Sequence, residues 1–202
     1  MPSFPPIEAA ILAGGGSRRM GSDKAFLRLG SKTVIEKLIE TLRADYAPIR
    51  VIGPPRPQTE QLGLPVQPDL RPDCGPLGGI HAALATASHQ SVLVTGCDFP
   101  FLDRALLHHL AGLLPGHDAV VPVWEGRPVP VCAFYAVRCL GAVEARLERR
   151  RLKAADFLDD VSVRWVKEAE LQSLDPGGLS FFNLNTPEHY RIAQEIEAQA
   201  ER

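Results

Sequence analysis

Short apolar runs alternate with helical patterns along the first half of this chain, and the alternation limits the folds it can adopt. Apolar runs of strand length occur at 7–12, 49–52 and 91–95, and helical patterns lie between them at 33–44 and 77–86. Such a rhythm is typical of right-handed crossovers and a mainly parallel sheet. Ligands of open sheets bind outside the carboxyl ends of the strands. The sequence therefore predicts an α/β fold whose functional residues follow strands.

The second half of the chain predicts an antiparallel addition to this sheet. Strand patterns at 119–123 and 131–136 flank the turn residues 125–128, which favours a hairpin or a close antiparallel pair. Asp103 is a candidate N-cap for a helix over 105–114, because its carboxylate can accept from the first free N–H groups. We also expect a helix at 138–150, a shorter one near 154–158, a strand at 161–166 and a last helix at 187–200.

Composition bounds the class of protein. A chain of 202 residues can bury one substantial core, and without a repeat or linker we expect one domain over 1–202. The net charge of -2 gives no global attraction to nucleic acid or to an anionic membrane. The four cysteines lack CxxC spacing, which indicates reduced thiols. With no signal-peptide pattern and no long apolar run, we expect a cytoplasmic protein.

A glycine-rich, basic segment follows the first apolar run. Residues 12–24 read LAGGGSRRMGSDK and include the cations Arg18, Arg19 and Lys24. The glycines let backbone N–H groups turn toward a polyphosphate, and the cations supply positive charge beside it. The segment is not a P-loop and lacks the dinucleotide-binding spacing. It predicts a nucleotide site of another kind, whereas a loop with solvated arginines would need only one or two glycines.

An aspartate follows the apolar run at 91–95. Asp98 comes directly after this buried run, within the sequence Cys-Asp-Phe-Pro at 97–100. The sheet would hold its backbone while its oxygens face the cleft, and Mg²⁺ prefers a few such oxygens together with phosphates and water. We therefore predict that Asp98 binds Mg²⁺. The alternative is an aspartate that only initiates a turn.

Two further segments combine turn residues with polar side chains. The stretch 69–80 runs from a short strand into a helix, and its glycines lie where an anion could approach the first turn of that helix. The structural alternative is a simple turn with a proline at the helix start. Asn183 and Asn185 precede the last helix, and their i, i+2 spacing on an extended segment points both amides toward one cleft. Capping by Asn185 or Thr186, with Pro187 in the first turn, is the structural alternative.

In their order along the chain, these motifs resemble those of the molybdenum cofactor guanylyltransferases. The matching patterns are LAGGxSxRMGxDK at 12–24, GPLxG at 75–79, CDxP at 97–100 and NxNTP at 183–187, and they span nearly the whole chain. The resemblance implies a three-layer α/β/α, Rossmann-like nucleotidyltransferase fold with a mixed, mainly parallel sheet. It also implies transfer of GMP from GTP to the terminal phosphate of Mo-molybdopterin, which yields molybdopterin guanine dinucleotide and pyrophosphate.

The resemblance also implies roles for individual residues. Those expected to carry catalysis are Arg19, Lys24 and Asp98, with Asp98 as the Mg²⁺ ligand. Those expected to bind the nucleotide are Leu12, Ala13, Gly14, Lys24, Asp69 and Asp98, the first three reading guanine mainly through backbone groups. Those expected to bind molybdopterin are Gly75, Gly79, Asn183 and Asn185. Transient contacts with proteins that deliver molybdopterin or mature molybdoenzymes are a further expectation, and neither nucleic acid nor membrane is an expected partner.

Three alternatives stand beside this interpretation. A cytidylyltransferase acting on the same pterin resembles this chain but carries Leu-Ala-Ala-Gly, so Gly14 in place of alanine favours guanine. A sugar-phosphate nucleotidyltransferase is the second alternative. A nucleotide-binding regulator without turnover would need neither the metal carboxylate Asp98 nor Lys24 beside the α-phosphate.

The remaining features receive structural interpretations. The proline-rich stretch 53–57 is expected to be extended, with Gly53 offering only backbone to a ligand. Arg127 is expected to be an exposed hairpin residue. The cations at 149–151 are expected at a helix end, where they complement the helix dipole.

Overall fold

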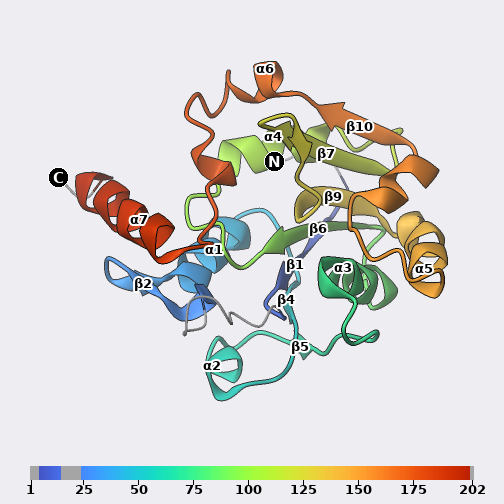
Figure 1. Cartoon of the computed structure of the whole chain (residues 1–202), viewed down its shortest axis with the longest axis horizontal. Coiled ribbons are helices and arrows are strands. Elements are labelled where there is room, and N and C mark those ends of the chain that lie inside the picture. The colour runs from blue at the N-terminus through green and yellow to red at the C-terminus, as the bar shows by residue number, and fades with distance from the viewer. Residues whose placement is uncertain (1–4, 15–23, 201–202) are drawn as a thin grey trace.

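The computed structural model describes residues 5–14 and 24–200, and an eight-stranded mixed sheet forms its centre (Figure 1). Its strands follow the order β10-β7-β9-β6-β1-β4-β5, and β8 pairs with β7. Their bounds are β1 Glu8–Leu12, β4 Ile49–Ile52, β5 Val66–Gln67, β6 Ser91–Gly96, β7 Ala119–Trp124, β8 Arg127–Pro128, β9 Cys132–Ala136 and β10 Val163–Val166. A separate hairpin joins β2 (Arg28–Leu29) to β3 (Lys32–Thr33).

Strand direction confirms a mixed, mainly parallel sheet. The neighbours β6, β1, β4 and β5 run parallel, whereas β9 runs antiparallel to both β6 and β7. The register pairs Leu12 at the end of β1 with Ile52 on one side and with Gly96 on the other. The carboxyl ends of three strands therefore meet at one edge of the sheet.

Helices cover both faces of the sheet, which gives the three layers. The α-helices are α1 Val34–Arg43, α2 Pro57–Glu60, α3 Gly75–Ala85, α4 Arg104–Gly112, α5 Leu140–Glu148, α6 Glu168–Leu171 and α7 Pro187–Ala200. Residues of α1 and α4 share one apolar core with Ala9 and Ile11 of β1, and residues of α3 and α5 share the other core with Ala10. Successive residues of a strand point to opposite faces, so one buried strand serves both cores.

Local signals account for several helix ends. Thr33 caps α1, because its Oγ1 accepts from the Glu36 amide while the Glu36 carboxylate accepts from the Thr33 amide. The Asp103 side chain caps α4 as predicted, accepting from the Leu106 amide at 2.9 Å. Such caps contribute about 1 kcal/mol each. The last helix, α7, lies beside β2 at one side of the molecule (Figure 1), and a small core of Leu29, Val34, Leu184 and Ala193 joins them.

Several predicted elements differ from those observed. The helix expected at 138–150 divides into a 3-10 turn, Val137–Cys139, and α5. The segment near 154–158 is a 3-10 helix over Asp156–Asp160, and the strand expected from 161 begins at Val163. The extended conformation predicted for 53–57 is wrong at its last residue, because Pro57 starts the short helix α2. The fixed φ of proline suits the first turn of a helix. The other 3-10 helices are Lys24–Phe26 and Leu179–Phe181.

Candidate active site

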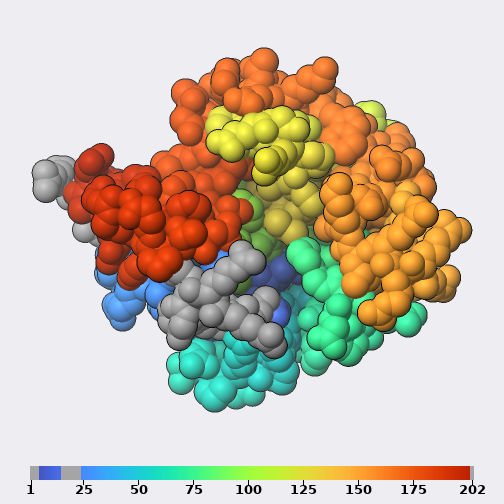
Figure 2. All heavy atoms as spheres, in the orientation of Figure 1, coloured from blue at the N-terminus to red at the C-terminus, as the bar shows by residue number. Residues whose placement is uncertain are grey.

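A cavity of about 800 Å³ opens at the edge where the carboxyl ends of β1, β4 and β6 meet. Figure 2 looks onto a hollow between the green surface of α3 and the red segment that leads into α7. The strand ends contribute Leu12, Ile52 and Gly96 to the cavity wall, and the loops that follow them add Gly14, Pro54, Pro55, Cys97 and Asp98. The predicted position of the ligand site, outside the carboxyl ends of parallel strands, thus coincides with a cavity.

Asp98 occupies the turn after β6. Gly96 makes this turn possible, because a Cβ at that position would lie 2.7 Å from Asp98 Oδ1 and 3.1 Å from the Phe99 ring. The Asp98 side chain is 22% exposed and lines the cavity. Burial raises the pKa of its carboxyl, although the nearby Lys24 charge opposes that shift. Asp98 is therefore a largely desolvated carboxylate that a cation in the cavity would stabilise.

Lys24 joins the strand end to the segment before α7. Its Nζ lies 3.9 Å from Asp98 Oδ2 and donates a hydrogen bond to Asn185 Oδ1 at 2.7 Å. Asn185 Nδ2 in turn donates to Asn183 Oδ1 at 3.2 Å. The Leu184 amide donates to the Asp98 carbonyl at 3.0 Å, so the two loops are also joined through their backbones. Four residues from three separate sequence motifs, Lys24, Asp98, Asn183 and Asn185, are therefore in one contact network.

Asp69 and Gly14 lie next to each other in the cavity wall. A Cβ at Gly14 would lie 3.0 Å from Asp69 Oδ2 and 3.7 Å from the Gly53 Cα. Burial raises the pKa of the Asp69 carboxyl. Within residues 5–14 and 24–200, that carboxylate has neither a hydrogen bond nor an ion pair. Among the described residues, Asp69 is thus an acceptor in the cavity wall to which no group donates.

The first turn of α3 forms another part of the wall. Gly75 has a φ of +56°, a left-handed conformation that glycine adopts without strain. A Cβ on Gly79 would lie 3.0 Å from the Leu12 side chain, so this glycine lets α3 approach β1 closely. Gly75, Pro76 and Gly79 line the cavity, so the positive end of the α3 dipole lies at its wall, an environment that favours anions.

The other predicted residues have different positions. Ala13 is buried and its amide donates to the Ile52 carbonyl at 2.8 Å, so that N–H serves the sheet and is not available to read a base. Arg19 and Arg18 lie outside the described residues. Arg127 is exposed in β8, as predicted. Thr186 rather than Asn185 caps α7, since its Oγ1 accepts from the His189 amide at 3.1 Å.

Sequence reasoning missed much of the apolar wall. Besides Ile52, the cavity is lined by Pro54, Pro55, Pro68, Pro72 and Val131. The proline-rich stretch was a usable signal, because rigid residues directly after a buried strand must lie at the carboxyl edge of the sheet. Val131 could not have been found in this way, since only the pairing of β9 with β6 brings it there.

Comparison with known proteins decides the family. The MobA-like NTP transferase domain matches residues 9–163. The chain belongs to this family. A probable molybdenum cofactor guanylyltransferase of Pelotomaculum thermopropionicum is 38% identical over 177 residues, which cover 88% of this chain and 86% of that protein. A molybdenum cofactor guanylyltransferase of Desulfosudis oleivorans is 33% identical, with 93% and 94% covered.

A solved structure extends the family likeness to the fold. The molybdopterin-guanine dinucleotide biosynthesis protein A of Archaeoglobus fulgidus superposes with a TM-score of 0.82 at 30% identity, covering 95% of this chain and 99% of the other. The predicted three-layer fold is confirmed, and so is the prediction that this member of the MobA-like family is a nucleotidyltransferase enzyme. Among the residues that the structure describes, no helix has the length and apolarity needed to cross a bilayer.

Proposed function

We propose that the enzyme transfers GMP from GTP to the terminal phosphate of Mo-molybdopterin, forming molybdopterin guanine dinucleotide and pyrophosphate. The observation that carries this proposal is the contact network in which Lys24, on the cavity wall, lies between Asp98 and Asn185. It joins the loop after β6 to the asparagine segment before α7. The names of the family relatives support the choice of both substrates.

The chemistry requires positioning and charge neutralisation rather than a strong base. A phosphate monoester has a second pKa of about 6, so at neutral pH its oxygen can attack an α-phosphate without deprotonation by the enzyme. Bringing two polyanions together is the main obstacle. Lys24 supplies positive charge where the α-phosphate and the incoming phosphate would meet, and Arg19 is proposed to assist.

The residues present fit a Mg²⁺ ion at Asp98. Mg²⁺ is commonly bound by one or two carboxylates together with substrate phosphates and water, and Asp98 is a desolvated carboxylate on the cavity wall. A Mg²⁺ ion held there would supply positive charge that neutralises the substrate phosphates. Asp98 would hold the ion, while Lys24 at 3.9 Å would turn its charge toward the phosphates.

Guanine recognition would rest on Asp69. Guanine presents two neighbouring donors, N1–H and the N2 amino group, which match the two oxygens of a carboxylate. Asp69 has the required acceptors, no competing partner among the described residues, and space created by the absent side chain of Gly14. Pro54, Pro55 and Pro68 would provide the apolar surface against which the base lies.

A substrate comparison tests the proposal. Purified enzyme is incubated with Mo-molybdopterin, Mg²⁺ and either GTP or CTP, and the dinucleotide product and pyrophosphate are measured. We expect guanine dinucleotide to predominate with GTP and little product with CTP. Preference for CTP would identify a pterin cytidylyltransferase, transfer only to a sugar phosphate would identify that class, and binding of GTP without transfer to any acceptor would identify a regulator.

A further inference from the structure

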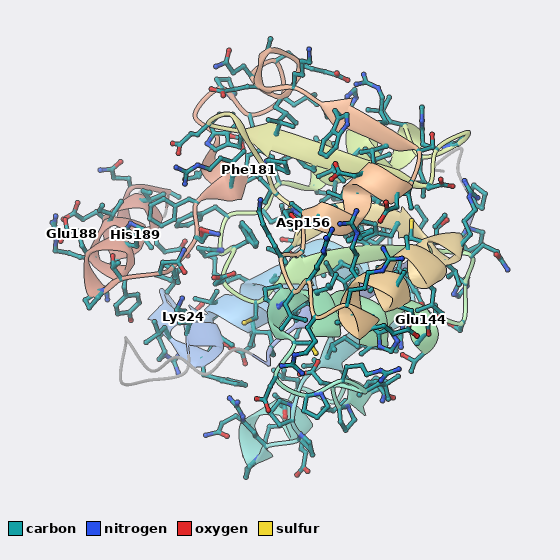
Figure 3. The ribbon with its side chains drawn as sticks, turned by 45° about the vertical axis from the view of Figure 1, so that its right-hand side comes forward. Lys24, Glu144, Asp156, Phe181, Glu188 and His189 are labelled. Carbon is teal, nitrogen blue, oxygen red and sulfur yellow. The ribbon has the colours of Figure 1, made fainter. Side chains whose placement is uncertain are left out.

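We propose that His189 is a positioning residue for the reaction, one that holds Asn183 and Asn185 in the orientation from which Asn185 binds Lys24. This inference rests on the proposed function, in which these asparagines face molybdopterin. His189 is the third residue of α7 and lies behind the asparagine segment, outside the cavity wall. Figure 3 labels His189 at the start of α7 and Lys24 on the neighbouring segment.

The imidazole contacts the backbone on both sides of Leu184. His189 Nδ1 lies 2.8 Å from the carbonyl oxygen of Asn183 and 3.4 Å from the amide nitrogen of Asn185. When Nδ1 carries a proton, it donates to the Asn183 carbonyl; when it does not, it accepts from the Asn185 amide. The shorter distance assigns the proton to Nδ1. One ring nitrogen thus restrains the segment that presents both amide side chains.

Aromatic packing holds the ring in this place. The His189 ring lies 5.6 Å from the Phe182 ring, centroid to centroid, and Phe182 lies 6.1 Å from Phe101. Phe101 belongs to the loop after β6 that carries Asp98. Packing therefore anchors the imidazole to the same loop that would hold the metal ion, and limits its rotation.

From His189 the contacts continue to the proposed reaction centre. Asn185 Oδ1 accepts from Lys24 Nζ at 2.7 Å, and this nitrogen lies 3.9 Å from Asp98 Oδ2. An Asn185 amide that is free to rotate would offer Lys24 a less persistent acceptor. The lysine would then be drawn toward the Asp98 carboxylate, because opposite charges attract strongly where water is partly excluded. His189 thereby acts on the acceptor side through Asn185, without touching substrate.

A purely structural role for the imidazole is separable from this one. The cap of α7 uses the backbone amide of His189 and the hydroxyl of Thr186, so it survives replacement of the side chain.

Three variants test the imidazole itself. His189→Asn keeps a donor at the position of Nδ1, His189→Gln moves the amide one atom farther along the side chain, and His189→Leu removes it. Arg191→Ala is the matched control, since Arg191 pairs with Glu188 on the exposed surface of the same helix.

Two measurements are made on the full-length enzyme. Hydrogen–deuterium exchange follows the backbone amides of 183–186, and steady-state kinetics with Mo-molybdopterin and GTP give KM and kcat. For His189→Leu and His189→Gln we expect faster exchange and a KM for Mo-molybdopterin raised about fivefold to tenfold, the scale of one net hydrogen bond. We expect the GTP Kd to rise less than the pterin KM, His189→Asn to restore both readouts, and Arg191→Ala to match the wild type.

The outcomes separate this inference from the proposed function. If the wild type transfers GMP but the Leu and Gln variants keep a normal pterin KM, the positioning role is refuted while the proposed function stands. The same holds if His189→Asn is as impaired as His189→Leu. If the wild type transfers nothing to Mo-molybdopterin, the proposed function itself fails, and the positioning role fails with it.

Discussion

Replacing Gly14 with alanine should reduce GTP affinity through its effect on Asp69. The new methyl group would lie 3.0 Å from Asp69 Oδ2, whereas ordinary van der Waals contact begins at 3.4 Å. The carboxylate must therefore move by a few tenths of an ångström or rotate away. Asp69 has no partner to lose among the described residues, so we expect the free energy of unfolding to change by less than about 1 kcal/mol.

We expect Gly14→Ala to weaken GTP binding rather than folding. Displacing Asp69 from guanine would remove a hydrogen bond to a charged group, which is worth about 1.5–3 kcal/mol. This corresponds to a GTP Kd raised roughly tenfold to 150-fold. Isothermal titration of GTP and CTP would measure the change, with melting temperature as a control for the fold. CTP affinity should change little, because cytosine lacks the paired donors of guanine.

A double-mutant cycle tests whether Gly14 acts through Asp69. We expect Gly14→Ala to weaken GTP binding strongly in the wild type and hardly at all in an Asp69→Ala background, where no carboxylate remains to be displaced. Equal losses in the two backgrounds would show that the methyl group obstructs the ligand directly. A Gly14→Ala enzyme that retains the wild-type GTP Kd would refute the proposed reading of guanine by Asp69.

Three further perturbations address the rest of the site. Asp98→Asn should lower transfer at least about a hundredfold. Because burial raises the pKa of Asp98, ionisation of this carboxyl costs stability as pH rises through that pKa. At neutral pH and without ligand, the Asn variant should therefore melt no lower than the wild type. Near-normal turnover would exclude Asp98 as the metal ligand. Gly96→Ala should lose activity and also about 1–3 kcal/mol of stability, since its methyl would meet both Asp98 and the buried Phe99 ring. Urea unfolding measures the stability, and an unchanged midpoint would contradict the predicted loss. Replacing Asn183 and Asn185 together with alanine should weaken pterin binding and spare GTP binding, and titrations that show equal loss of both ligands, in proportion to lost stability, would make these asparagines structural.

Local sequence signals were sufficient for most elements of the fold. The bounds of α7 and the N-cap Asp103 follow from side chains within a few residues of each helix end. The boundaries that differ lie where packing decides. The Phe157 ring packs at a tilt against the Tyr135 ring, with centroids 5.6 Å apart. This contact between residues far apart in sequence accompanies a 3-10 helix where the local pattern predicted a helix near 154–158.

The order of the motifs determined the family, and the position of Asp98 after a strand determined where a metal ligand would be expected. Those inferences need only short-range patterns, because backbone direction and side-chain period are local properties. Only the tertiary structure decided which residues meet. Lys24 and Asn185 lie far apart in sequence, as do Gly14 and Asp69, yet strand order and loop packing bring each pair into contact. The same holds for the buried pair of Glu8 and Arg50, whose 2.8 Å contact depends on the register of β1 against β4. Such contacts depend on strand order, register and loop packing across the whole chain, and no local sequence pattern encodes them.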